Sequence, residues 1–243
     1  MPNFDLTNKN IIVTGAARGN GLAMSRGLCE AGANVIGIDK VLNEDQEFIL
    51  RKVDITNEAE VDIFFDKIKK EFGHIHGLIN NAGVSIGSDQ PYSNMDSYFS
   101  TIEVNLNAVF YLTSMLCEHM AKRGGGSIVN ITSLGAHQGF PQNPSYQISK
   151  AGLQQLTRAF ACDWGVKGIR LNNLCPGYIK TSMTQGSFDD PELHKQRLDR
   201  TMLNRWGKSE DLIGAAIFLL SEASSYITGS TIFVDGGWTA KGF

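Results

Sequence analysis

The 243-residue chain lacks the features that mark metal-binding, secreted and membrane proteins. Its four cysteines are widely separated and form no Cys-x-x-Cys pair, which argues against a zinc site and against a disulfide framework. The first residues show no basic segment followed by an apolar one, and no apolar run is long enough to cross a bilayer. We therefore expect no metal, no membrane partner, four buried free thiols and a cytoplasmic protein.

Charge is also sparse and evenly mixed. Charged residues make up 19% of the chain and the net charge is −3, without the basic stripe that binding to a phosphate backbone requires. We therefore expect no nucleic-acid partner. Hydrophobic residues make up 42%, which suffices for a buried core, and no linker or low-complexity segment divides the chain. The sequence predicts one domain over residues 1–243.

Short apolar runs alternate with longer segments of helical period. This alternation predicts an α/β fold: a single-domain, doubly wound (Rossmann) parallel sheet of about seven strands with helices on both faces. The expected strands are 11–14, 35–38, 49–53, 78–80, 127–131, 170–174 and 231–234, and the expected helices are 22–31, 59–72, 98–122, 145–164 and 210–220. Segment 181–205 is polar and contains Gly186 and Pro191. We interpret it as a substrate lid.

A glycine-rich turn at 14–21 follows the first strand and opens a helix. Such a turn lets a pyrophosphate approach the backbone at the helix N-terminus, although an ordinary strand-to-helix turn looks the same. The residues expected to contact the cofactor here are Gly15, Arg18, Gly19, Asn20 and Gly21. Asp39 ends the second strand, where a carboxylate can bind the adenosine ribose and repel a 2′-phosphate, so we predict NAD. Asp39 could instead cap a helix, and Arg18 or Lys40 could reach a 2′-phosphate.

The segment YQISK places Tyr146 and Lys150 at i and i+4, on one face of a helix. A free phenol has a pKa of about 10, and stabilising its anion enough for catalysis near neutral pH requires roughly 3–4 kcal/mol. The Lys150 cation and the positive nicotinamide ring could supply this. Ser133 follows an apolar strand, where its hydroxyl could polarise a carbonyl. Taken singly, however, the Tyr–Lys pair also fits an exposed helix surface, and Ser133 also fits a turn.

In this order, these motifs resemble those of the short-chain dehydrogenase/reductase family, in its form of about 250 residues, and the match runs nearly end to end. Residues 14–21 match the TGxxxGxG turn, and NNAG at 80–83 matches the motif after the fourth strand. Asn105, Ser133, Tyr146 and Lys150 match the catalytic tetrad, with thirteen residues from Ser133 to Tyr146. The remaining matches expected to contact the cofactor are Asp54, Asn81, Ala82, Gly83, Pro176, Gly177, Ile179 and Thr181.

The resemblance implies a hydride transfer between a nicotinamide cofactor and a secondary alcohol or ketone. By the same resemblance Tyr146 is the general acid–base, Ser133 orients the substrate oxygen, Lys150 binds the nicotinamide ribose and lowers the tyrosine pKa, and Asn105 supports a proton-relay water. It also implies a homotetramer formed by the long helices and the last strand, with Phe233 and Trp238 adding apolar surface.

Two departures from the family pattern concern the cofactor site. Asn20 replaces the apolar residue usual between the last two glycines, which puts the fine geometry near the phosphate in doubt. Only about fifteen residues separate Asp39 from Asp54, so we expect a shortened helix between the second and third strands and a more open adenine pocket.

The substrate is a small molecule whose identity depends on loops. His137, Gln138, Asn143 and Gln147 offer polar contacts that suit a hydroxylated compound, and the segments 205–212 and 234–238 resemble those of sugar-acid dehydrogenases, the class that includes gluconate 5-dehydrogenases. A sugar acid or polyol is therefore the expected substrate. Two alternatives are a 3-oxoacyl carrier-protein reductase, against which Asp39 argues mildly because such enzymes normally use NADPH, and a catalytically silent NAD-binding regulatory protein.

Overall fold

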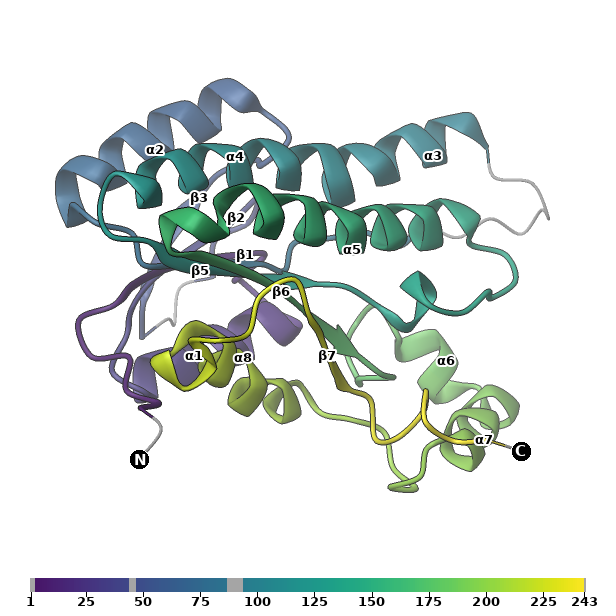
Figure 1. Ribbon diagram of the computed structural model, residues 1–243. Helices are drawn as coiled ribbons and strands as arrows, with labels where there is room; N and C mark the ends of the chain where they lie inside the picture. Colours follow the sequence, from purple (N-terminus) through teal and green to yellow (C-terminus); the bar gives the residue numbers. More distant parts are fainter. Residues whose placement is uncertain (1–2, 44–46, 87–93, 243) are drawn as a thin grey trace.

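The computed structural model describes residues 3–43, 47–86 and 94–242, which form one doubly wound α/β domain (Figure 1). Seven parallel strands form a single sheet in the order β3-β2-β1-β4-β5-β6-β7. The strands are β1 Asn10–Thr14, β2 Asn34–Asp39, β3 Ile49–Lys52, β4 Gly77–Asn80, β5 Gly126–Ile131, β6 Ile169–Pro176 and β7 Thr231–Val234. The expected fold class and all seven strands are confirmed.

Helices cover both faces of the sheet (Figure 1). On one face lie α2 (Glu58–Phe72), α3 (Met95–Ile102), α4 (Ala108–Ala121) and α5 (Pro144–Trp164), and on the other lie α1 (Gly19–Glu30) and α8 (Ile213–Leu220). Each face has its own buried apolar cluster: Leu112 of α4 and Phe65 of α2 belong to one, and Leu28 of α1 and Ala216 of α8 belong to the other. Because both faces are covered, the strands are almost wholly apolar.

The expected helix 98–122 is interrupted. It begins as α3, passes through a π-helical turn at Glu103–Asn107 and continues as α4. The π turn inserts an extra residue without changing the apolar pattern enough to be visible in the sequence, and such turns occur often at functional sites.

The segment interpreted as a lid also has regular structure. It contains α6 (Gln185–Asp189) and α7 (Pro191–Arg200), which lie beyond the carboxyl edge of the sheet (Figure 1). The side chain of Asp190 accepts hydrogen bonds from the N–H groups of Glu192 and Leu193, and Pro191 occupies the first turn of α7. The sequence therefore carries a helix-start signal inside the segment interpreted as a lid.

Three smaller expectations are revised. Of the four free cysteines, Cys117 and Cys175 are buried as expected, but Cys29 is partly exposed and Cys162 is exposed. Between β2 and β3 the described residues form no helix, so the expected shortened helix is absent from 40–43 and 47–48. Trp238 is 4% exposed, so it does not supply the surface apolar patch expected of it.

In the described residues, no helix is long and apolar enough to span a membrane. The same residues contain no group of three or more His, Cys, Asp or Glu side chains that could hold a metal ion. The strand order reverses between β1 and β4. A doubly wound sheet binds its ligand in the crevice at this reversal, outside the carboxyl ends of the strands. This is where the site residues gather.

Candidate active site

A cleft of about 930 Å³ opens along the carboxyl edge of the sheet, from β2 and β3 across β1 and β4 to β5 and β6. It is large enough for a small-molecule cofactor together with a substrate. Most residues predicted from the sequence line it: Gly15, Arg18, Gly19, Asn20, Asp39, Asn81, Ala82, Gly83, Ser133, Tyr146, Lys150, Pro176, Gly177, Ile179 and Thr181. Gly21, Asp54 and Asn105 do not line it, and each has another structural role.

The glycine turn is packed so closely that side chains are excluded. Gly15 has φ +66°, and a Cβ there would lie 2.9 Å from the Cα of Ala82. A Cβ on Gly21 would lie 2.0 Å from the carbonyl oxygen of Gly15, so Gly21 allows α1 to approach the turn, and its contact with the cofactor stays a prediction. The N-terminus of α1 has no side-chain cap, which leaves its N–H groups available for an anion. This cradle fits a dinucleotide pyrophosphate.

Asn20, the departure from the family pattern, connects two distant segments. Its Oδ1 accepts a hydrogen bond from the hydroxyl of Ser209 at 2.8 Å, which links the start of α1 to the turn before α8. The polar side chain therefore has a protein partner at the edge of the cleft.

The carboxylate of Asp39 faces the cleft and holds the backbone around it. Its Oδ2 accepts a hydrogen bond from the N–H of Ala17 at 3.0 Å, and its Oδ1 accepts one from Val41 at 3.3 Å. No helix begins in the described residues 40–43, so the helix-cap alternative is wrong there. Lys40 pairs with Asp54, with 2.9 Å between Nζ and Oδ2. Asp54 does not line the cleft, whereas its neighbours Val53 and Ile55 do. The direct contact of Asp54 with adenine therefore stays a prediction.

The loop after β4 is anchored to the loop after β1. The hydroxyl of Thr14 accepts hydrogen bonds from the N–H groups of Asn81 and Ala82, at 3.0 and 2.9 Å. The Asn81 amide donates to the carbonyls of Thr14 and Gly15, at 3.0 and 3.1 Å. Thr14 was missing from the predicted contacts, although it opens the glycine motif. Its side chain aligns the two loops on which the cofactor would rest.

Asn105 lies in the π turn and is fully buried. Its Oδ1 accepts a hydrogen bond from the N–H of Val84 at 2.8 Å, and its Nδ2 donates to the Val84 carbonyl at 2.9 Å and to the Ser149 hydroxyl at 3.0 Å. Both amide N–H groups are thus committed to the protein, so the side chain has none left for a relay water. A Cβ on Gly83 would lie 3.2 Å from Asn105 Oδ1 and 3.5 Å from Lys150 Nζ, which places Asn105 directly behind the cleft wall.

Ser133, Tyr146 and Lys150 form one wall of the cleft. Lys150 is 4% exposed, which excludes a helix-surface role for it, and its Nζ lies 5.8 Å from the ring centre of Tyr146. The same Nζ donates to the carbonyl of Ile131, at the end of β5, at 2.8 Å. Ser133 follows that strand, and its Oγ accepts a hydrogen bond from the N–H of Gly135 at 3.2 Å, so the turn and the site interpretations of Ser133 both hold.

Burial perturbs the two ionisable groups in opposite directions. It raises the pKa of Tyr146, and hydrogen bonding to Ser133 opposes that increase. It lowers the pKa of Lys150 to about 8. Both shifts have the same cause, since desolvation disfavours the charged form of each group. At neutral pH the phenol is therefore protonated, and only positive charge or hydrogen-bond donors supplied next to it would lower its pKa.

The segment after β6 brings the lid against the glycine turn. A Cβ on Gly19 would lie 3.9 Å from the Cγ2 of Thr181. Thr184 fixes the local turn, because its hydroxyl donates to the carbonyl of Ile179 at 2.6 Å and accepts a hydrogen bond from the N–H of Thr181 at 3.0 Å. The segment therefore lies against the glycine turn and lines the same cleft.

Two of the loop residues expected from the sequence to contact substrate, Gln147 and Gln138, have hydrogen-bond partners within the protein. Gln147 Oε1 accepts from the N–H of Phe140 at 2.7 Å, and its Nε2 donates to the carbonyls of Phe140 and Asn143, at 2.7 and 2.9 Å. Gln138 Oε1 accepts from the indole N–H of Trp238 at 3.0 Å. These side chains shape the loop between β5 and α5, and their direct contact with substrate stays a prediction.

Comparison with known proteins agrees with this geometry. A family model described as enoyl-(acyl carrier protein) reductase matches residues 15–239. The 2-dehydro-3-deoxy-D-gluconate 5-dehydrogenase of Escherichia coli K12 is 35% identical over 98% of both chains, and the gluconate 5-dehydrogenase of Gluconobacter oxydans is 35% identical over 98% of this chain and 97% of its own. The chain belongs to the short-chain dehydrogenase/reductase family.

A solved member of the short-chain dehydrogenase/reductase family has nearly the same backbone. The crystal structure of a gluconate 5-dehydrogenase from Burkholderia cenocepacia, in complex with NADP and tartrate, matches with a TM-score of 0.93 at 34% identity, covering 99% of each chain. Membership and fold together establish an oxidoreductase that transfers a hydride between a nicotinamide cofactor and a secondary alcohol or ketone.

Proposed function

We propose that this dehydrogenase/reductase uses Tyr146 as the general acid–base that protonates or deprotonates the substrate oxygen. Ser133 shares the cleft wall with Tyr146 and holds that oxygen, and Lys150 binds the nicotinamide ribose and stabilises the phenolate. Asn105 positions the wall through Val84 and Ser149; its support of a relay water stays a prediction. When bound, the cofactor supplies the hydride acceptor or donor and a positive ring. The common wall formed by Ser133, Tyr146 and Lys150 carries this proposal.

The proposed substrate is a sugar acid, oxidised at a secondary alcohol or formed from the corresponding ketone. The names of the relatives, gluconate and 2-dehydro-3-deoxy-gluconate 5-dehydrogenases at 35% identity, support this class. The test is a turnover assay in both directions with sugar acids, polyols, simple secondary alcohols and acyl thioesters. Preference for an acyl thioester would support the carrier-protein reductase instead, and turnover of none of them would support the silent regulator.

The proposed cofactor is NAD(H). Asp39 places a carboxylate in the cleft, and the Lys40 cation beside it is paired with Asp54 rather than free to meet a 2′-phosphate. Because the crystal structure of the Burkholderia relative contains NADP, the cofactor preference has to be measured on this protein. The ratio of kcat/KM for NADH and NADPH tests it directly. Equal or better use of NADPH would show that Arg18, which also lines the cleft, overcomes the carboxylate.

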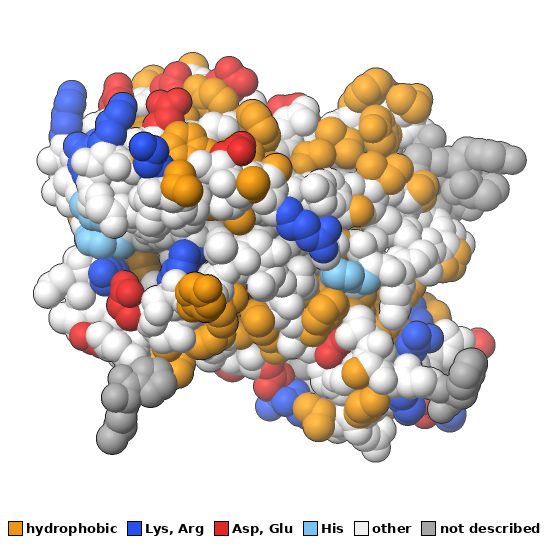
Figure 2. All heavy atoms as spheres, viewed as in Figure 1, with side chains coloured by type: hydrophobic (Ala, Val, Ile, Leu, Met, Phe, Trp, Pro, Cys, Tyr) orange, Lys and Arg blue, Asp and Glu red, His pale blue; other side chains and the backbone are white. Residues whose placement is uncertain are grey.

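We also propose a homotetramer and a mobile lid over 181–205. Apolar side chains gather on the helical face over α3 (Figure 2), and Phe99, Phe110 and Ile148 of this face are each more than half exposed, at 61%, 54% and 52%. Phe233 on the edge strand β7 is 41% exposed. Burying these patches across two-fold axes would stabilise an assembly. A monomeric mass by light scattering at micromolar concentration would contradict the tetramer.

A further inference from the structure

Arg197 of α7 has no acidic partner within the described chain. Its guanidinium carbon lies 4.6 Å from the ring centre of Tyr178, its Nε is buried without a hydrogen-bond partner, and its Nη1 makes only a long 3.5 Å contact with the neighbouring Gln196. Stacking on a ring uses the face of the guanidinium and leaves the N–H groups along its edge unused. Those groups suit a carboxylate, which accepts two parallel hydrogen bonds from such a fork.

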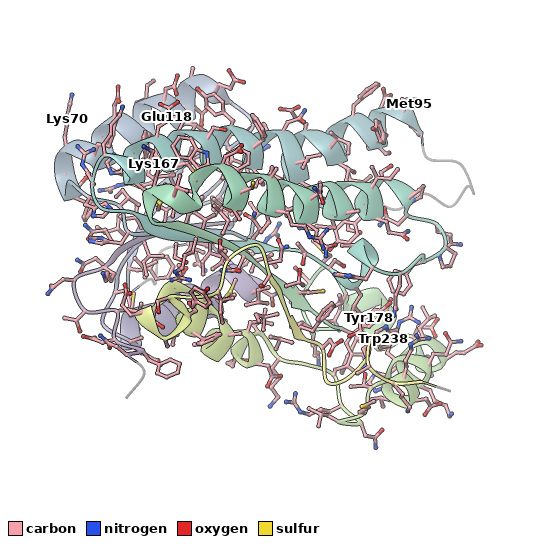
Figure 3. The ribbon with its side chains drawn as sticks, in the orientation of Figure 1. Lys70, Met95, Glu118, Lys167, Tyr178 and Trp238 are labelled. Carbon is pink, nitrogen blue, oxygen red and sulfur yellow. The ribbon has the colours of Figure 1, made fainter. Side chains whose placement is uncertain are left out.

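Tyr178 connects Arg197 to the reactive end of the cleft. It follows Gly177, which lines the cleft, and lies beside Trp238 at the end of the molecule covered by α7 (Figure 3), with 4.8 Å between the two ring centres. Tyr178 also packs against the buried cluster that contains Cys175 of β6 and Leu134, the residue that follows Ser133. Packing contacts therefore lead from Arg197 through Tyr178 to the segment that carries Ser133, on the same cleft wall as Tyr146.

The neighbouring lid cations are already paired or held elsewhere. Arg205 forms two hydrogen bonds with Asp211, at 2.7 and 2.8 Å, and Lys195 pairs with Asp199 at 2.6 Å. The guanidinium of Arg200 lies over the Trp238 ring, not over Tyr178. Arg197 is thus the lid cation that combines a free hydrogen-bonding edge with contact to Tyr178.

We propose that Arg197 binds the carboxylate of the substrate and thereby selects sugar acids over neutral polyols. This inference rests on the proposed substrate class and adds the residue that recognises it. In a six-carbon acid that reacts at C5, four carbon–carbon bonds separate the reacting carbon from the carboxylate carbon. The substrate then extends from Tyr146 along Tyr178 to Arg197, and the Tyr178 ring keeps the guanidinium in place while the lid closes.

The test compares D-gluconate with D-sorbitol, which has the same carbon skeleton and a CH₂OH group in place of the carboxylate. Arg197→Gln should raise KM for gluconate by about tenfold to hundredfold, the usual loss for a hydrogen bond to a charged group, with kcat within about threefold of wild type. KM for sorbitol should not change. Arg197→Lys keeps the charge but not the fork, so its KM for gluconate should fall between those of wild type and Arg197→Gln.

The matched control is Lys195→Gln, which removes one positive charge from the same helix through an exposed side chain paired with Asp199. It should leave KM for gluconate unchanged. This outcome would show that direct hydrogen bonding by Arg197, and not the net positive charge of the helix, lowers KM for gluconate. Melting temperature and NADH binding confirm that each variant is folded. If the wild-type protein turns over gluconate and Arg197→Gln keeps the wild-type KM, Arg197 does not bind the carboxylate, although sugar acids are still the substrate class. If wild type turns over no sugar acid, both proposals fail.

Discussion

At the carboxyl edge of the sheet Lys150 donates a hydrogen bond to a backbone carbonyl, whereas at the amino edge two histidines accept hydrogen bonds from backbone N–H groups. His76 Nδ1 accepts from Asn10 at 3.1 Å, and His119 Nε2 accepts from Ile75 at 3.2 Å. An acceptor nitrogen of imidazole must be unprotonated, while an ammonium group can only donate. The two edges therefore require opposite protonation states of their basic side chains.

Burial lowers the pKa of each of these groups. That of Lys150 falls to about 8, and those of His76 and His119 fall to about 4. At neutral pH the lysine is therefore still mostly charged and the histidines are neutral. The carboxyl edge keeps a buried cation beside Tyr146, where we propose catalysis, and the amino edge excludes charge and stabilises the fold. Variants at each edge should accordingly change different properties.

The largest expected effect is that of Tyr146→Phe at the carboxyl edge. It removes the transferable proton and keeps the ring, so kcat should fall by about a hundredfold to ten-thousandfold. The dissociation constant for NADH, measured by fluorescence titration, should barely change. Retention of kcat within about tenfold, a loss under roughly 1.4 kcal/mol, would mean that the phenol is not the principal proton donor.

Lys150→Ala should weaken both cofactor binding and catalysis, because one ammonium is proposed to serve both. Without this cation the phenolate is harder to form, so the rate of alcohol oxidation should reach its plateau at higher pH than in the wild type. A pH–rate profile at saturating cofactor measures this shift. An unchanged or lower kinetic pKa would show that Lys150 does not stabilise the phenolate.

His119→Gln tests the amino edge, since glutamine can accept the Ile75 hydrogen bond without titrating. The unfolded histidine takes up a proton near its ordinary pKa of 6.5, and the folded one does so only near 4. Stability should therefore fall as the pH drops from 6.5 to 4, by as much as about 3 kcal/mol from His119, which is 5% exposed.

Urea unfolding of the His119→Gln variant at several pH values measures this slope, which should be shallower than in the wild type. The positive charges of Arg123, His74 and Lys69 also face this histidine and act in the same direction as burial. Turnover at pH 7 should stay within about twofold of wild type, because the site is at the other edge. An unchanged pH slope would show that His119 is not the acid-sensitive group.

The smallest effect is expected from Lys40→Met, which breaks the exposed Lys40–Asp54 pair at the carboxyl edge. The two side chains are 58% and 32% exposed. Exposed ion pairs contribute about 0–1 kcal/mol, so the free energy of unfolding should change by less than about 1 kcal/mol. A loss above about 2 kcal/mol in urea unfolding would contradict the view that this edge is used for binding rather than for stability.

The sequence by itself determined the sheet and the positions of most site residues. Alternating apolar runs can be buried on both faces only as parallel strands, and the residues that follow such strands must meet at one edge. Gly15, Asp39 and Ser133 were therefore placed at this edge without any structure, whereas Tyr146, which lies on α5, was placed there by the resemblance of its motif to that of the family. The start of α7 could also have been predicted, because Asp190 and Pro191 form a recognisable helix cap and first turn.

Tertiary structure alone decided which side chains face the cleft and which support it. Gln138 was expected to contact substrate, yet its amide accepts from Trp238, one hundred residues away, and no local pattern encodes such a pairing. The π turn that buries Asn105 is a one-residue change in helical winding, which the apolar period does not reveal. Arg197 acquires its significance only from the Tyr178 ring beneath it, because a charged residue on a polar helix is uninformative until its partners are known.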